Sequence, residues 1–174
     1  YDWDLMPLNP YATPTTVSER QMIGALCHDA GAAANMDYTT TGSGTWNQSA
    51  RDALTDTFGY RQAFTTNAFD DNQNPPTELL DTNLDAGYPL QFAIIDFVDD
   101  EGHEIICDGY GFLYGARYYH LNLGWAGIDN LWYNLPVVDL RYDFTSVGGV
   151  LFNVFPDKTG EIISGRVTDE NDAG

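Results

Sequence analysis

Two cysteines and three histidines are the side chains of this 174-residue sequence best suited to thiol and imidazole chemistry. Cys27 and His28 are adjacent, so on a helix their side chains diverge by about 100° and cannot form a nucleophile and base pair. Neither cysteine stands in a C-x-x-C pair or at a metal-binding spacing. Cys27 is predicted to be a small core residue on an apolar helical face, and His120 a structural residue in an aromatic strand.

His103 has a different setting. It begins a predicted strand after a glycine-containing loop, and Asn122 lies near the end of the next strand. If the two strands pair about a loop at 110–115, His103 faces Asn122 and Asp108 faces Arg117, an opposite-charge pair that favours this register by up to about 1 kcal/mol. The Asn122 amide oxygen would then accept from one imidazole nitrogen and leave the other for a nucleophile.

Several segments resemble one known family. Residues 103–111 (HEIICDGYG) and 118–127 (YYHLNLGWAG) resemble the histidine strand and the Asn-Trp-Gly-Trp-Gly-Gly segment of streptopain-type cysteine peptidases, which belong to the papain-like group. Residues 1–7, residues 29–38 with 42–44, and residues 58–60 resemble further family blocks in the same order. Colinear blocks over residues 1–155 are more specific than a single motif.

The resemblance implies roles for two groups of residues. In the catalytic group, His103 would be the general base and later the acid, Asn122 its orienting partner, and Trp125 an aromatic wall over their hydrogen bond. Leu123 occupies the family's first tryptophan position, so one wall of the substrate cleft is altered. The substrate-binding residues implied are Gly42, Ser43, Gly44 and Leu123.

The family's nucleophilic cysteine, in a Gly-Cys-x-Ala-Thr context, lies upstream of the block at residues 1–7, and no such block occurs here. Cys27 and Cys107 fall at non-catalytic positions of the family. We therefore expect a portion of a secreted bacterial cysteine endopeptidase, inactive by itself, whose partners are a peptide or protein substrate and the missing N-terminal segment of its own domain. The alternative is a catalytically inactive peptide- or protein-binding module on the same fold. Neither hypothesis requires a cofactor or a metal.

The composition excludes some classes of binding partner. Seven Lys and Arg stand against 26 Asp and Glu, a formal net charge of −19. This charge would repel nucleic acid and anionic membranes, and no apolar run approaches the roughly 18 residues of a membrane span. The distributed acidity indicates a hydrated surface, as in secreted or salt-adapted proteins. A cation-dependent adhesive module at residues 70–71 and 99–101 is a third hypothesis, without calcium-loop spacing.

The predicted elements are helices followed by strands, an α+β arrangement. Thr16 and Glu19 form a capping box for a helix over 17–33, Thr45 and Gln48 repeat the pattern for a second helix that stops at Gly59, and a short helix spans 77–86. Strands are predicted at 90–98, 104–109, 117–123, 131–135 and 149–155, the last two pairing with each other. We expect a partial papain-like fold, N-terminal helices and then a twisted antiparallel sheet, over 1–156. Residues 157–174 resemble a linker and the first strand of a β-sandwich module.

Overall fold

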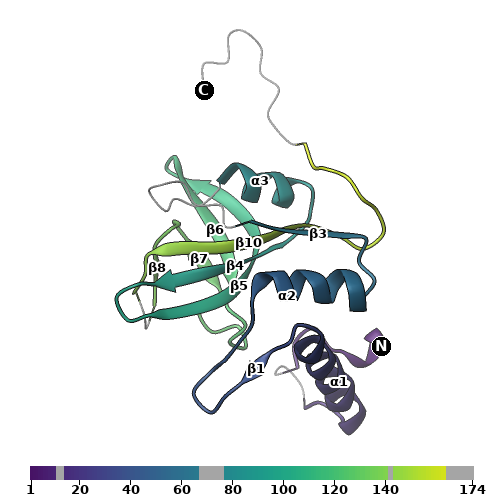
Figure 1. Ribbon diagram of the computed structural model, residues 1–174. Helices are drawn as coiled ribbons and strands as arrows, with labels where there is room; N and C mark the ends of the chain where they lie inside the picture. Colours follow the sequence, from purple (N-terminus) through teal and green to yellow (C-terminus); the bar gives the residue numbers. More distant parts are fainter. Residues whose placement is uncertain (11–13, 67–76, 141–142, 164–174) are drawn as a thin grey trace. The chain divides into compact units, whose positions relative to one another are not determined.

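The computed structural model describes residues 1–10, 14–66, 77–140 and 143–163 (Figure 1). The chain divides into two compact units, Tyr1–Tyr60 and Arg61–Gly174. The first contains the first two predicted helices, and the second contains the third helix and the sheet. His103, Asn122 and Trp125 all lie in the second unit.

The first unit is built around one long helix. Its elements are η1 (Trp3–Leu5), α1 (Val17–Ala33), β1 (Asp37–Tyr38), β2 (Ser43–Gly44), α2 (Asn47–Asp52) and η2 (Ala53–Thr57). Both hydrogen bonds of the predicted Thr16/Glu19 capping box are present, which confirms the start of α1. The Tyr1 hydroxyl donates to the Asp29 carboxylate at 2.6 Å and ties the N-terminal stretch to α1. Only Gly31 of α1 is buried, and the prediction that Cys27 is a core residue is wrong because its side chain is exposed.

The start of the second helix also differs from the prediction. The Thr45 hydroxyl donates to the Ala34 carbonyl oxygen at 2.5 Å rather than capping a helix. The helix therefore begins after Trp46, with no side-chain cap. Gly59 has a φ of 75°, so the predicted left-handed stop is confirmed.

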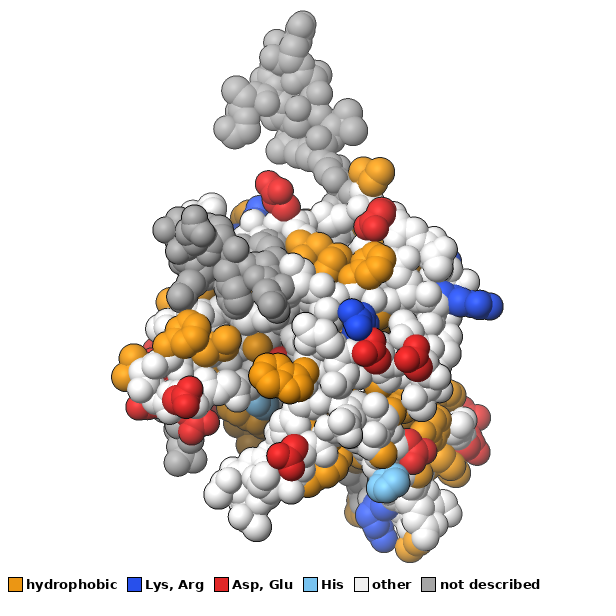
Figure 2. All heavy atoms as spheres, viewed as in Figure 1, with side chains coloured by type: hydrophobic (Ala, Val, Ile, Leu, Met, Phe, Trp, Pro, Cys, Tyr) orange, Lys and Arg blue, Asp and Glu red, His pale blue; other side chains and the backbone are white. Residues whose placement is uncertain are grey.

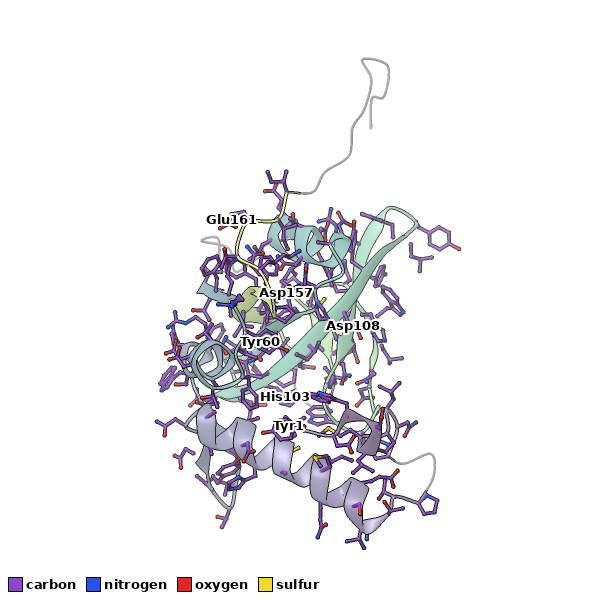
Figure 3. All side chains as sticks on the ribbon, turned by 90° about the vertical axis from the view of Figure 1, so that its right-hand side faces the viewer. Tyr1, Tyr60, His103, Asp108, Asp157 and Glu161 are labelled. Carbon is purple, nitrogen blue, oxygen red and sulfur yellow. The ribbon has the colours of Figure 1, made fainter. Side chains whose placement is uncertain are left out.

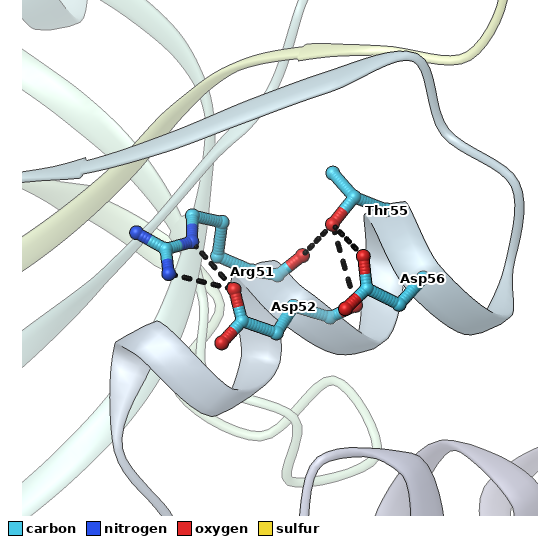
Figure 4. Close-up of polar contacts among 4 residues, drawn as sticks. All are labelled: Arg51, Asp52, Thr55 and Asp56. Atoms are coloured by element: carbon cyan, nitrogen blue, oxygen red, sulfur yellow. Dashed lines mark hydrogen bonds and ion pairs between the residues drawn. The ribbon is translucent and has the colours of Figure 1, made fainter.

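Where α2 passes into the wider π-helical turn η2, polar side chains bond along the helix (Figure 4). Arg51 donates to the Asp52 carboxylate with its Nη2 atom at 2.6 Å. The Thr55 hydroxyl lies 3.3 Å from the Arg51 carbonyl oxygen and 3.1 Å from Asp56 Oδ1. The Arg51–Asp52 ion pair is largely exposed and contributes a few tenths of a kcal/mol.

The second unit is an antiparallel sheet with one helix, α3 (Thr77–Asp85). Its six strands have the order β3-β10-β4-β5-β6-β7. Their bounds are β3 (Gln62–Thr66), β10 (Ser146–Phe155), β4 (Leu90–Asp96), β5 (Glu101–Leu113), β6 (Ala116–Asn122) and β7 (Leu131–Tyr133), and a separate pair joins β8 (Val138–Asp139) to β9 (Asp143–Phe144). The α+β prediction is confirmed, but the pairing of the last two predicted strands is wrong, because β10 pairs with β3 and β4 while β7 pairs with β6.

The register of β5 and β6 also corrects the prediction. β5 continues to Leu113 and turns through Tyr114 and Gly115, which have φ values of 51° and 83°. Two successive left-handed residues are typical of the tight two-residue hairpin turn. The observed pairs are Ile106 with Asn122 and Phe112 with Arg117, and one residue, Asp108, is left unpaired in a bulge. His103 is therefore not opposite Asn122, and Asp108 is not opposite Arg117.

The hydrophobic core lies on the face of the sheet that α3 covers. It contains Leu80, Leu90, Phe92, Ile94, Ile105, Cys107, Tyr119, Leu121, Leu123, Val138, Phe144, Val147 and Val150. The Tyr119 hydroxyl donates to Asp81 Oδ1 at 2.8 Å, and the Tyr110 hydroxyl donates to Asp85 Oδ1 at 2.7 Å. Asn83, also on α3, accepts the buried Asn153 N–H of β10 at 2.9 Å. These bonds fix α3 on the sheet.

A C-terminal strap, residues 157–163, follows β10 without forming a strand. The Gln62 side-chain amide makes two bonds to Gly160, donating to its carbonyl oxygen at 2.6 Å and accepting from its N–H at 2.9 Å. Asn153 donates to Glu161 Oε2 at 2.9 Å. Figure 3 shows Asp157 and Glu161 on this strap. The strand predicted for a following module is absent over 160–163, and residues 164–174 lie outside the described part.

Two surface properties bear on partners. No helix in the described part of the chain is long and apolar enough to cross a membrane. Figure 2 shows acidic side chains scattered over the visible face rather than gathered in one block. This distribution agrees with the hydrated acidic surface that the composition predicts.

Candidate active site

His103 lies near the start of β5, on the same face of the sheet as Ile105 and Cys107, and is partly buried. Its Nε2 atom is 2.7 Å from the Leu123 carbonyl oxygen. Because a carbonyl can only accept, Nε2 must carry the proton. In the neutral ring the lone pair is then on Nδ1, so Nδ1 is the nitrogen able to accept a proton from a nucleophile.

Trp125 covers one side of the imidazole. The His103 and Trp125 ring centroids are 4.7 Å apart and their planes differ by 28°, a stacked arrangement. When the β5–β6 register is continued three residues past Asn122, the residue opposite His103 is Trp125. Trp125 therefore lies beside the histidine, but it covers the ring rather than a His103–Asn122 bond, and its catalytic role stays a prediction.

The carboxamides of Asn122 and Asn130 bond to the backbone around Leu123 rather than to the His103 ring. The Leu123 N–H donates to Asn130 Oδ1 at 2.9 Å, and the Gly124 N–H donates to Asn122 Oδ1 at 3.0 Å. The predicted direct hydrogen bond from His103 to Asn122 is therefore wrong, because the register places Asn122 beside Ile106 and its oxygen accepts from Gly124. The sequence gives no sign of the role of Asn130, since its place after Gly127 and Asp129 indicates only a turn.

The four predicted substrate-binding residues have different settings. Leu123 has no exposed surface and belongs to the core, so its expected place as an open wall of the cleft is corrected. Ser43 and Gly44 form β2 and pair with β1 in the first unit. The Gly42 carbonyl accepts from the Thr39 N–H at 3.0 Å, which closes the connecting turn. A substrate role for Gly42, Ser43 and Gly44 stays a prediction.

Neither cysteine is a nucleophile within the second unit. Burial raises the pKa of the Cys107 thiol to about 12, so it is not ionised at neutral pH. Cys27 is exposed in the first unit. His120 Nδ1 is 2.5 Å from Asp108 Oδ1, which agrees with its predicted structural role. The described residues contain no cluster of three His, Cys, Asp or Glu side chains suited to a metal, and residues 70–71 fall outside them.

Comparison with known proteins identifies the family. The model of the "Peptidase C10 family" matches residues 1–133. This chain belongs to the peptidase C10 family. Streptopain of Streptococcus pyogenes is 25% identical over 154 residues, which are 88% of this chain and 37% of that protein. The thiol protease/hemagglutinin PrtT of Porphyromonas gingivalis is 28% identical over 133 residues, 75% of this chain and 14% of that protein. The chain thus spans well under half the length of these relatives.

Solved structures show the same fold. The active wild-type interpain A cysteine protease of Prevotella intermedia superposes with a TM-score of 0.73 at 24% identity, covering 89% of this chain and 64% of that one. A prointerpain A fragment from the same organism gives a TM-score of 0.69 at 26% identity, covering 89% and 48%. The predicted α+β fold of papain-like cysteine peptidases is confirmed. Family and relatives together indicate a cysteine peptidase of the C10 type.

Proposed function

We propose that this chain is the histidine-bearing portion of a secreted cysteine endopeptidase, whose nucleophilic cysteine lies outside residues 1–174. The observation that carries the proposal is the His103 ring, which is bonded through Nε2 at 2.7 Å and stacked on Trp125, leaving Nδ1 as the proton acceptor. Peptide bonds would be hydrolysed by a thiolate and imidazolium pair. The PrtT and streptopain relatives support this at the level of the family.

In the proposed reaction, the cysteine thiol transfers its proton to His103 Nδ1 and the thiolate attacks the substrate carbonyl carbon. The imidazolium then gives that proton to the leaving amine as the C–N bond breaks, and an acyl-enzyme thioester remains. His103 next takes a proton from the water that attacks the thioester. The C–S bond then breaks, the carboxylic acid product leaves, and His103 returns the proton to the sulfur. Throughout, the Nε2–H bond to the Leu123 carbonyl stabilises the positive ring, since charge-assisted hydrogen bonds are about twice as strong as neutral ones.

Asn122 and Asn130 act as positioning residues in this scheme. The N–H groups on either side of the Leu123 carbonyl donate to them. Asn122 accepts from the Gly124 N–H at 3.0 Å, and Asn130 accepts from the Leu123 N–H at 2.9 Å. The carbonyl therefore keeps one direction, and with it the imidazole plane. Trp125 excludes water from one ring face and strengthens the bond to the carbonyl. In this proposal Asn122 acts on His103 through the backbone rather than by direct contact.

The substrate of the proposed enzyme is a peptide or protein segment in extended conformation. Gly42, Ser43 and Gly44 are the proposed backbone contacts, because a strand without bulky side chains allows a peptide to approach closely. The remaining part of the catalytic domain would be an N-terminal segment that carries the cysteine. The thiol mechanism needs no cofactor, and the acidic surface fits secretion.

The second candidate is an inactive peptide-binding module on the same fold. One observation favours it: the cysteine nearest to His103 along the chain, Cys107, is fully buried, and burial raises its pKa to about 12. A thiol in this state is a poor nucleophile. The two candidates differ in whether the parent protein carries a reactive cysteine that depends on His103.

Reaction of the parent protein with iodoacetamide at neutral pH, followed by peptide mapping, tests the proposal. We expect rapid labelling of a cysteine upstream of Tyr1, and at least a tenfold slower reaction in His103→Ala. His120→Ala is the matched control, since His120 bonds Asp108 rather than Leu123. Labelling confined to Cys27, or an upstream rate that does not change in His103→Ala, contradicts the proposal.

A further inference from the structure

A second open surface lies on the sheet face that turns away from α3. Side chains of Tyr110 and Tyr119 point to α3, so the alternating neighbours Gly111 and Tyr118 belong to the opposite face. There a hollow of about 410 Å³, which we call the aromatic groove, is lined by Gly111, Leu113, Tyr118 and Trp132 and by the chain at Phe112, whose ring lies under Arg117 on the other face. Gly111 is eight residues along β5 from His103, roughly 25 Å at strand spacing. The groove is therefore separate from the candidate active site.

Glycines form the floor of the aromatic groove. A Cβ atom at Gly109 or Gly111 would lie 3.7 Å from the Trp132 ring, so the indole rests directly on the β5 backbone. On the same face, the His120 ring centroid is 5.3 Å from that of Trp132. Asp108 bonds His120 from the bulge at 2.5 Å. Trp132 is thus supported by its neighbours although 53% of its surface is exposed.

The walls of the groove are apolar, yet they carry unused donors. Leu113 and Trp132 are 55% and 53% exposed. The Tyr118 hydroxyl and the Trp132 indole N–H have no hydrogen-bond partner in the described part of the chain. A cluster of exposed apolar side chains on so acidic a protein marks an interaction surface. Its ligand must offer apolar rings or chains together with hydrogen-bond acceptors.

A polyproline II segment meets this requirement. Its backbone carbonyl groups make no internal hydrogen bonds, and its pyrrolidine rings are apolar and rigid. Grooves lined by aromatic side chains bind such segments at low entropic cost, because the bound conformation exists beforehand. The Tyr118 hydroxyl and Trp132 N–H would donate to the peptide carbonyls. A saccharide would need more polar wall groups than this groove provides.

Charge selects the flanking residues of the segment. Asp108 is 41% exposed beside the groove. Arg117, from the same hairpin, points to the other face, where its Nη2 atom is 3.3 Å from Asp81. The described residues of the second unit contain 14 acidic and three basic side chains. A positively charged segment is therefore attracted and a negative one repelled.

We infer that the aromatic groove binds a proline-containing, positively charged segment of polypeptide, and that this segment belongs to the protein substrate. Binding itself requires only the groove. The assignment to the substrate rests on the proposed peptidase function. The groove would then hold a substrate at a point distant from the bond that is cut.

Titration of the 174-residue chain with a 12-residue peptide of alternating proline and arginine pairs, followed by NMR, tests binding. We expect saturable shifts of the Trp132 indole N–H signal, and at least tenfold weaker binding in Trp132→Ala or when every proline of the peptide is alanine. Replacing the peptide arginines by glutamate, or Asp108→Asn, should weaken binding several-fold. Trp46→Ala is the matched control, since Trp46 is an exposed tryptophan of the other unit and should leave the affinity unchanged.

Trp132→Phe keeps the apolar wall and removes only the N–H donor, so it should bind more weakly than wild type but more tightly than Trp132→Ala. Unsaturable shifts, equal binding of the alanine peptide, or preferential binding of maltohexaose overturn the groove assignment. In the parent protein, adding the segment to a short substrate should lower KM at constant kcat, and Trp132→Ala should abolish that gain. An unchanged KM overturns the substrate assignment, whereas a parent that cleaves no peptide refutes the proposed function and leaves the NMR result standing.

Discussion

The bond between α3 and β10 gives the clearest test of what stabilises the second unit. Asn83 is 1% exposed, and its Oδ1 atom accepts the N–H of Asn153, which is 3% exposed, at 2.9 Å. Asn83→Ala removes this acceptor and leaves a buried backbone N–H without a partner. Such a group costs about 1–3 kcal/mol. We expect the free energy of unfolding to fall by about 2 kcal/mol, a large part of the total for a small domain.

Urea denaturation measures the effect, with an unchanged m-value showing that only stability has altered. Thr82→Ala is the matched control. Thr82 and Asn83 both donate to the carbonyl oxygen four residues earlier in α3, at 2.6 and 3.1 Å, but only Asn83 also accepts from β10. The control should stay within about 0.5 kcal/mol of wild type. Equal losses in the two variants, or continued exchange protection of the Asn153 amide in Asn83→Ala, would refute the reasoning.

Three further outcomes are expected. Gly148→Ala places a Cβ atom 2.5 Å from that of Ala93, so it should lower the unfolding free energy by about 1–3 kcal/mol, whereas Gly42→Ala, with no atom near, should not. Burial raises the pKa of Asp81 despite the opposing Tyr119 hydrogen bond. The protonated form is therefore favoured by the native state, and the stability of wild type relative to Asp81→Asn should fall as pH rises from about 4 through the raised pKa; a flat difference contradicts this. In native protein at pH 8, iodoacetamide should modify exposed Cys27 and spare Cys107, as mass spectrometry can show, and equal labelling would be inconsistent with a buried thiol.

Features that depend on local sequence were predicted well. The start of α1 follows from a capping box between Thr16 and Glu19, residues only three apart. The left-handed stop at Gly59 and the end of α3 before Gly87 follow from backbone freedom that glycine alone has in full. Such signals involve one turn of chain, and they hold where no distant partner competes; at Thr45 the Ala34 carbonyl oxygen did compete, and the predicted cap did not form.

Features that depend on pairing were predicted poorly. β3 is recognised as a strand only through β10, whose paired residues lie about 85 positions later in the chain. The β5–β6 register depends on the position of the hairpin turn at Tyr114, which adopts a φ of 51° although tyrosine rarely does so. The unpaired Asp108 then changed the register by one residue, between Gly109 with His120 and Cys107 with Leu121. Neither the turn nor the bulge has a strong signature in residue type.

The candidate site includes residues that the sequence could indicate and residues that it could not. His103 and Trp125 were identified from residue type and from the family resemblance, and the stacked rings place them together. The atom that bonds His103 is a backbone carbonyl, and every residue has one, so residue type could not single out Leu123. Asn130 also acts through the backbone, by accepting from the Leu123 N–H, and its residue type did not indicate this role.

The strap also determines how tension on the chain would be carried. A pull applied beyond Ile163 meets the two Gln62 bonds to Gly160 before it reaches the end of β10. Both bonds would be loaded together rather than opened one after the other, and the Asn153 bond to Glu161 shares the load. Force would therefore enter the sheet at β3 and β10, and β5, which bears His103, is separated from β10 by β4 and would remain unstretched until those side-chain bonds break.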